Sequence, residues 1–297
     1  MRAHVILVLL LLSACGGRRY GWETGPRDDR VRSRPLLAKV QLKPASDAAE
    51  TSLWDQRDHK DARRSLIALL ETRTAGESAS DYQALVRLSR LYYLEGQAED
   101  ERAQQLAAYE QGMRFGDRAL HTFSSFREHF EATGAVEKAV LSLGEEAIAA
   151  IYWNAVNTGK WAKSKGLVKI LFYKDRVREM IEHARSLNPG FFHGAPDRYL
   201  GAYFAALPTV AGRDLARSKE HFDRTLVQGA EYLGTRVTMA EYYAVAKDDP
   251  ELYRSLLEEV LAAPGDRPAD VAAEQRMAKA RAARMLDEIE DLFDVDF

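Results

Sequence analysis

The stretch DRYLGAYFAALPTVAGRDLARSKEHFDRTLVQG, residues 197–229, decides the fold of this chain of 297 residues. Its apolar spacing predicts one helix over residues 197–207 and a second over residues 214–228. Pro208 ends the first helix and Gly229 ends the second, because neither residue continues a helix well. The loop between them is short, so the two helices are expected to lie side by side and antiparallel.

Small and aromatic residues follow each other at fixed spacing within this pair. Gly201 is followed three positions later by Phe204, and Ser218 precedes Phe222 by four. A small residue lets two helices approach closely, and the nearby ring fills the space beside it. This is the packing of tetratricopeptide (TPR) repeats, whose period is about 34 residues.

Comparable spacings occur in three other places: Ala240 before Tyr243, Leu252 before Leu256, and Ser89 before Tyr92. The separation of Gly201 and Ala240 is longer than one TPR period, so the repeats are degenerate. The pattern predicts an all-α protein in which TPR-like antiparallel helix pairs form a compact α-solenoid or superhelix. A plain helical bundle is the alternative.

Helical periodicity continues over almost the whole chain after Ser46, and alternation typical of strands is nearly absent. Gly76 and Gly96 are expected to end helices. The other predicted helices cover residues 99–121, 136–157, 168–187, 235–246, 250–263 and 268–293. We therefore predict a single helical domain over residues 46–297.

The N-terminus has the pattern of an export signal. Arg2 precedes an apolar run over residues 5–12, which is too short to span a bilayer. The following LSAC ends in Cys15, the only cysteine of the chain, and resembles the lipobox of bacterial lipoproteins. We predict a signal peptide over residues 1–14 and lipidation of Cys15. The alternative is an ordinary signal peptide that ends near a cysteine by chance.

Residues 15–45 are rich in Arg, Asp, Gly and Pro and show no steady periodicity, which predicts a flexible tether. Membrane attachment is then expected through the lipid anchor only, with the helical body at the periplasmic face of a bacterial membrane. The formal net charge of −3 gives no general reason to expect nucleic-acid binding.

Motifs for catalysis or metal binding are not found in the sequence. The seven histidines include no pair four apart with an intervening glutamate, and no glycine-rich phosphate loop or Gly-x-Ser-x-Gly elbow occurs. We therefore predict a protein that is not an enzyme and has no cofactor and no metal site. An active site scattered along the chain is the weaker alternative.

An unusual group of large aromatic residues lies close to lysines between positions 152 and 172. The predicted ligand-binding residues are Tyr152, Trp153, Lys160, Trp161, Lys163 and Phe172. Together they indicate a pocket for a ligand with an apolar body and an anionic end. Trp161 is expected beyond a helix end. The alternative is that the rings belong to the core and the lysines to a solvated loop.

The chain resembles the T component family associated with TRAP (tripartite ATP-independent periplasmic) transporters. Three stretches carry the resemblance: IYWNAVNTGKWAKSKG, residues 151–166, then residues 193–229, then RVTMAEYYAVAKDDPELYRSLLEEVLAAP, residues 236–264. The tail EQRMAKARAARMLDEIEDLF, residues 274–293, is similar to the closing helix of the family. The resemblance covers roughly residues 99–297.

The resemblance implies a periplasmic lipoprotein with TPR-like helices that partners the substrate-binding protein of a TRAP-type transporter. It also implies an apolar channel in the helical body and assembly into a homotrimer. Two functions follow as hypotheses. The first is an accessory that binds a small apolar or amphipathic solute, and the second is a scaffold that assembles an envelope complex without a small ligand.

Overall fold

The computed structural model describes residues 48–74 and 81–293, and this part of the chain contains helices and no strand. The longer helices are α1 (Ala48–Asp55), α2 (Lys60–Thr74), α3 (Asp81–Ala98), α4 (Arg102–Leu120), α5 (Ser124–Thr133), α7 (Ile148–Lys165), α8 (Leu167–Leu187), α9 (Phe191–Ala206), α10 (Leu215–Gln228), α13 (Pro250–Ala262) and α14 (Ala272–Asp287). The shorter ones are α6 (Val136–Ala139), α11 (Gly234–Met239), a π-helical turn (Ala240–Ala244), α12 (Val245–Lys247) and α15 (Ile289–Phe293). The all-α prediction is confirmed.

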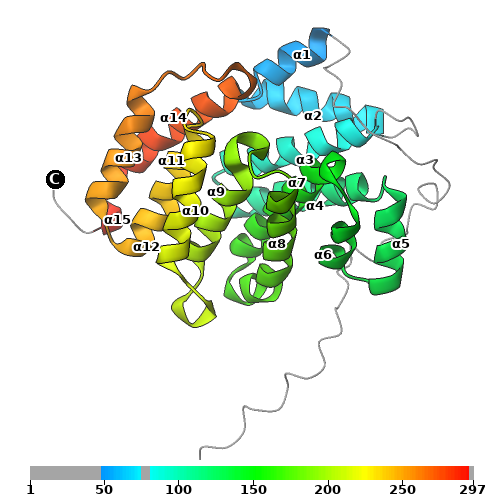
Figure 1. Ribbon diagram of the computed structural model, residues 1–297. Helices are drawn as coiled ribbons and strands as arrows, with labels where there is room; N and C mark the ends of the chain where they lie inside the picture. Colours follow the sequence, from blue (N-terminus) through cyan, green and yellow to red (C-terminus); the bar gives the residue numbers. More distant parts are fainter. Residues whose placement is uncertain (1–47, 75–80, 294–297) are drawn as a thin grey trace, which may run out of the picture.

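Helices that follow each other in the chain pack as neighbours, as with α3 and α4, α7 and α8, or α9 and α10 (Figure 1). The pair α9–α10 is the one predicted from residues 197–229. A Cβ atom on Gly201 would lie 2.8 Å from the ring of Phe222, so only glycine permits this approach. Ser218 Oγ also donates a hydrogen bond of 2.7 Å to the Gly201 carbonyl.

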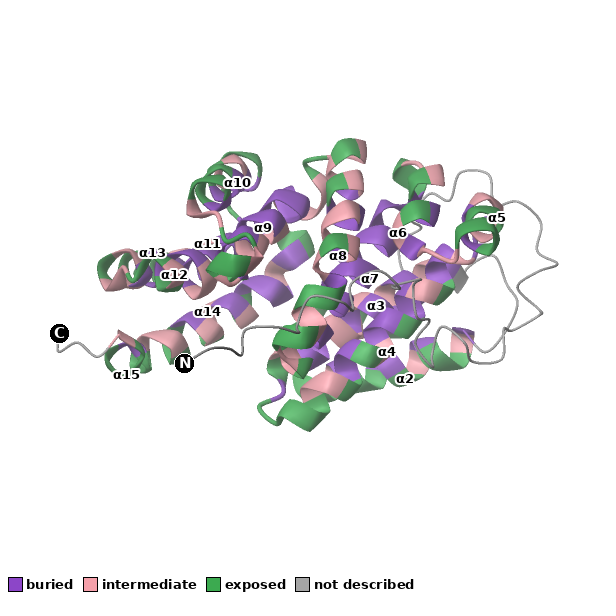
Figure 2. Ribbon diagram, turned by 90° about the horizontal axis from the view of Figure 1, so that it is seen from below, coloured by how far each residue is buried: buried purple, intermediate pink, exposed green. Residues whose placement is uncertain are grey.

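Helix α7 lies at the centre of the larger core, and thirteen of its eighteen residues are buried (Figure 2). Small residues bring α3, α4 and α7 together. Asn157 Nδ2 donates to the Ser89 carbonyl at 3.0 Å, and Ser89 Oγ donates to the Gly112 carbonyl at 2.7 Å. These bonds satisfy polar groups that would otherwise be buried at a cost.

Three predicted helix boundaries are wrong. Gly96 lies inside α3 and does not end it; its missing side chain makes room for the ring of Tyr109. The single helix expected over residues 136–157 is replaced by short turns up to Ala147, followed by α7. Helix α7 then continues to Lys165, so Trp161 lies within a helix and not beyond its end.

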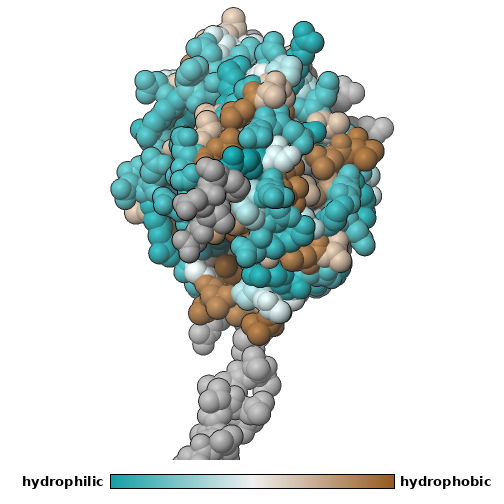
Figure 3. Space-filling view, turned by 90° about the vertical axis from the view of Figure 1, so that its left-hand side faces the viewer, coloured by the Kyte–Doolittle hydropathy of each residue, from teal (hydrophilic) through white to brown (hydrophobic). Residues whose placement is uncertain are grey.

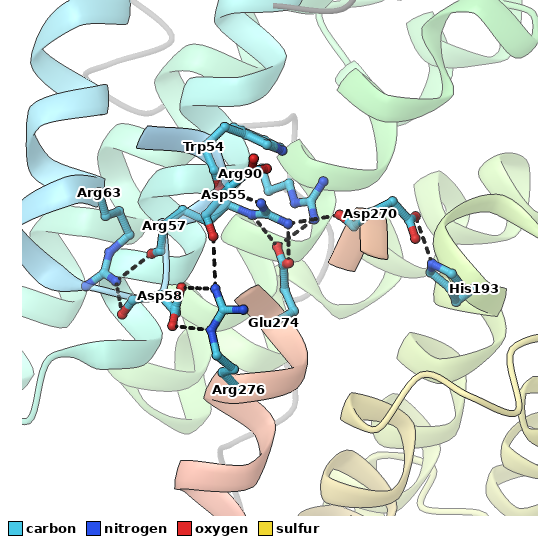
Figure 4. A network of polar contacts seen from close by, with 10 residues as sticks. All are labelled: Trp54, Asp55, Arg57, Asp58, Arg63, Arg90, His193, Asp270, Glu274 and Arg276. Atoms are coloured by element: carbon cyan, nitrogen blue, oxygen red, sulfur yellow. Dashed lines mark hydrogen bonds and ion pairs between the residues drawn. The ribbon is translucent and has the colours of Figure 1, made fainter. Parts of the chain in front are cut away.

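A set of ion pairs joins the first helices to the last (Figure 4). We call Trp54, Arg57, Arg90 and Glu274 the terminal clasp. Arg57 Nε donates to Glu274 Oε1 at 3.1 Å, and Arg90 Nη2 donates to the same oxygen at 2.5 Å. Both guanidinium groups also lie over the Trp54 ring, at 4.5 and 5.1 Å. Arg57 is 2% exposed and Glu274 is 5% exposed, so the clasp is shielded from water.

Cys15, the predicted signal peptide, the predicted tether and Gly76 lie outside the described residues. Within the described ranges, no helix combines the length and the apolar character needed to cross a membrane.

Candidate functional site

A cavity opens between α7, α8, α9 and the π-helical turn, with one side closed by α14. The cavity volume is about 180 Å³, and the cavity opens to solvent on one side. Small-molecule sites in proteins are lined mainly by apolar and aromatic side chains with a few polar groups.

Six tyrosines line the cavity: Tyr93, Tyr152, Tyr173, Tyr199, Tyr203 and Tyr242. Burial raises the pKa of Tyr203 to about 12 and holds the pKa of Tyr242 well above its ordinary value. These two hydroxyls therefore stay neutral at physiological pH. They add hydrogen-bonding capacity to the wall without adding negative charge.

The charged residues of the wall are strongly unbalanced in sign. The five cations are Lys160, Lys163, Lys174, Arg198 and Arg281, and the single carboxylate is Glu241. Glu241 pairs with Arg281 at 2.7 Å and lies 3.6 Å from Lys163. Lys174 pairs with Asp175 at 2.9 Å.

Glu241 is fully ionised in this environment. Burial opposes its ionisation, but Lys160, Arg281 and Lys163 outweigh that effect and lower the pKa of Glu241 to about 2. Burial lowers the pKa of Lys160 to about 7, and Glu241 offsets this only in part. Lys160 can therefore gain or lose its charge near neutral pH.

Lys160 and Arg198 have no carboxylate within 4 Å in the described part of the chain. Lys160 Nζ donates to the Tyr242 hydroxyl at 3.2 Å. The guanidinium of Arg198, which is 7% exposed, donates only to neutral oxygens, among them the His193 carbonyl at 3.1 Å. Two cations in the wall thus lack a direct ion pair with a described carboxylate, although Glu241 acts on Lys160 from a longer distance.

A left-handed turn at the start of α9 holds Arg198 in place. Phe192, His193 and Gly194 have φ values of 44°, 57° and 73°, which is costly for the first two residues. The turn directs the Phe192 and His193 carbonyls at Arg198. Gly229 makes the turn possible, because a Cβ atom there would lie 2.4 Å from the His193 carbonyl oxygen.

Two further backbone features shape the wall. The π-helical turn carries Glu241 and Tyr242, which both line the cavity although they are adjacent in sequence. Side chains of adjacent residues on a regular α-helix point about 100° apart, and π turns often occur at functional sites. On the opposite wall, a Cβ atom on Gly159 would lie 1.9 Å from the Tyr199 hydroxyl, so this glycine makes room for the ring.

Comparison with known protein families gives one match. The family model for the TRAP transporter T-component matches residues 87–293, from within α3 to the end of α15. The chain belongs to the TRAP transporter T-component family. The resemblance drawn from the sequence is confirmed, and every residue of the cavity wall lies inside the matched region. No curated protein matches the chain.

The structure of this T-component places three of the six predicted ligand-binding residues on the cavity wall. These are Tyr152, Lys160 and Lys163. Whether they bind a ligand stays a prediction.

The other three residues lie elsewhere. Trp153 is buried behind the wall and packs against Tyr93 and Phe192, with ring centroids 5.4 Å apart in both cases. Trp161 is also buried, against the edge of Tyr173. Phe172 is 51% exposed on the outer side of α8, because the adjacent Tyr173 occupies the position that faces the cavity.

Several wall residues of the T-component were not predicted from the sequence. Tyr199 and Tyr203 both face the cavity. Their spacing of four residues places them on the same face of a helix, so the sequence could have predicted this pair. In the sequence, Glu241 and Arg281 look like solvent-exposed helix residues. Their ion pair forms only when the helices that carry them pack together in the folded protein. Among the described residues, no group of three or more His, Cys, Asp or Glu side chains could hold a metal ion.

Proposed function

We propose that this T-component binds a small amphipathic anion in the cavity and hands it to, or receives it from, the substrate-binding protein of a TRAP-type transporter. The observation that carries the proposal is the pair of cations, Lys160 and Arg198, neither of which forms a direct ion pair with a described carboxylate, in a tyrosine-lined wall. A buried charge without a partner is costly, and an anionic ligand offsets that cost. The role is non-catalytic.

The apolar and polar parts of the wall fit the two ends of such a ligand. Val156, Ile170, Val177 and Leu207 supply apolar contact, while the tyrosine hydroxyls and the two cations supply donors. The same contacts favour a carboxylate or a similar anion over a neutral alcohol of equal length.

The prediction for this site is that octanoate binds and 1-octanol binds much more weakly. Lys160→Met should weaken octanoate binding about tenfold, because a hydrogen bond to a charged group is lost. Octanoate binding should also weaken as pH rises from 6 to 8, because Lys160 loses its proton near pH 7. Isothermal titration calorimetry at several pH values measures each effect.

Lys138→Met is the matched control, because Lys138 pairs with Glu179 on the outside of the protein and should not affect binding. The pH dependence should disappear in Lys160→Met and persist in Lys138→Met. If octanoate fails to bind, the scaffold function without a small ligand becomes the better reading. Equal binding by both variants and the unchanged protein would remove Lys160 from the binding site.

We further propose that the helix pairs are TPR-like and form one domain. The close approach of Gly201 to Phe222, and the burial of Ala240 and Leu256 in the next pair, support this arrangement. Assembly into a homotrimer is a proposal that rests on the resemblance alone.

Periplasmic attachment through lipidated Cys15 is proposed from the sequence of residues 1–15. Cys15→Ser should move the protein from the membrane fraction to the soluble fraction, because a lipidated cysteine supplies most of the membrane affinity. Fractionation followed by mass spectrometry of the N-terminal peptide measures both location and acylation. An unmodified N-terminal peptide from the unchanged protein would contradict the anchor.

A further inference from the structure

The first two turns of α8 expose a stripe of large apolar side chains. Leu167, Val168, Leu171 and Phe172 are 52%, 79%, 42% and 51% exposed. Their spacing places them on about 140° of the helix circumference. The other side of the same turns faces the cavity through Ile170 and Tyr173. We call these four residues the α8 stripe.

Lysines border the α8 stripe on both edges. At about 100° per residue, Lys174 lies beside Leu167 and Lys169 lies beside Phe172 around the helix. Lys163 and Lys165 precede the stripe at the end of α7. From position 147 to position 174 the chain contains five lysines and no acidic residue, although its overall charge is −3. Two of these lysines have acidic partners, since Lys174 pairs with Asp175 and Lys163 lies 3.6 Å from Glu241, so the border carries less net positive charge than its lysines alone would give.

The turn between α9 and α10 adds to the same end of the body. Val210, in the turn Thr209–Ala211, is 99% exposed, and the exposed Arg213 follows it. This turn and the N-terminal end of α8 lie together at the lower end in Figure 1. The space-filling view shows apolar side chains gathered at that end, next to hydrophilic ones (Figure 3).

We propose that this end is a membrane-contacting surface that binds the interface of a bilayer rich in anionic phospholipids. Amphipathic helices that lie in a bilayer interface have Leu and Phe on one face and Lys on its borders. The α8 stripe would insert among the headgroups while the bordering lysines contact phosphates. The cavity, on the other side of α8, then faces away from the lipid and stays close to the bilayer.

The chemistry favours a bilayer over a protein partner. A standard protein–protein interface takes roughly 20–30 residues on each side, whereas this end presents one two-turn stripe and one loop residue. The lysines on both edges match a surface that is negative all around the inserted side chains. The inference uses the proposed anchor only to bring the body to the membrane, and the experiment removes that anchor.

The experiment uses the chain from Gly16 onward, which keeps every described residue and lacks both the apolar leader and Cys15. Its co-sedimentation is measured with vesicles of phosphatidylethanolamine and phosphatidylglycerol (3:1) and with vesicles of phosphatidylcholine. We expect binding to the anionic vesicles that weakens with salt, and much weaker binding to phosphatidylcholine. Leu171→Asp with Phe172→Asp should weaken binding about tenfold or more.

Val227→Asp is the matched control, since Val227 on α10 is 84% exposed and lies outside the α8 stripe. It should leave vesicle binding unchanged. Equal loss in both variants, or no binding of the unchanged chain to anionic vesicles, would overturn the proposal. So would light scattering that shows an oligomer dissociated by Leu171→Asp, because the stripe would then join copies of this chain. Octanoate binding by the stripe variant shows separately whether the cavity still functions.

Discussion

Glu274→Gln is expected to lower the free energy of unfolding by about 3–5 kcal/mol, the largest effect of any single change considered for this protein. Glu274 is the carboxylate of the terminal clasp for Arg57 and Arg90, which are 2% and 14% exposed. Glutamine has nearly the same shape, so packing is kept while two shielded guanidinium groups lose their counter-ion. Urea unfolding followed by circular dichroism measures the change.

Glu259→Gln provides the comparison for this variant. Glu259 pairs with Arg236 at 2.7 Å, but the carboxylate is 54% exposed, and exposed pairs contribute at most about 1 kcal/mol. Similar losses in the two variants would mean that the clasp does not hold the terminal helices together.

The clasp also predicts sensitivity to acid. Burial opposes ionisation of Glu274, but Arg90 and Arg57 outweigh it and lower the pKa of Glu274 below its ordinary value of 4.5. A lowered folded-state pKa gives stability that is fully present above pH 4.5 and is lost as pH falls through the folded-state value. Glu274→Gln should therefore flatten the decline of stability below that pH.

Asp197→Asn is expected to be the second most damaging change, at about 2–4 kcal/mol. Asp197 is fully buried and accepts hydrogen bonds from His221 at 2.7 Å, Arg185 at 3.0 Å and Arg224 at 3.1 Å. These partners come from α8 and α10, so one carboxylate on α9 joins both of these helices to it. The amide of asparagine cannot satisfy three donors.

Asp223→Asn controls for the loss of a charge in the same region. Asp223 pairs with Lys219 on the outer face of α10 and is 52% exposed. Thermal melting should show a clear decrease for Asp197→Asn and little change for Asp223→Asn. An unchanged melting temperature in both would leave Asp197 without a structural role.

The sequence predicted neighbouring helix pairs better than it predicted contacts between residues far apart in the chain. Gly201 and Ser218 indicated the α9–α10 pair, because close helix packing requires small residues at the contact. Gly96 has the same role beside Tyr109, but a glycine in a helical segment is also typical of a helix end, so the local pattern does not distinguish the two. The Arg57–Glu274 pair joins residues 217 positions apart, and local sequence patterns do not predict a contact over such a separation.

Half of the predicted ligand-binding residues lie on the cavity wall, for a related reason. Tyr152, Lys160 and Lys163 lie on one helix, and their spacing alone brings them to one wall. Arg198 could not be found in this way, because its position depends on a left-handed turn that requires Gly229 at the end of α10. Trp153 and Trp161 are as aromatic as the wall tyrosines, and only three-dimensional packing separates core rings from wall rings.

The terminal clasp has a consequence for the order in which the chain can close. Synthesis proceeds from the N-terminus, so Arg57 is made long before Glu274, which is 217 residues further on. Until α14 is present, the guanidinium groups of Arg57 and Arg90 lack the carboxylate that pairs with both of them. A nascent chain that ends before α14 therefore lacks the contact by which its first helices are held to its last.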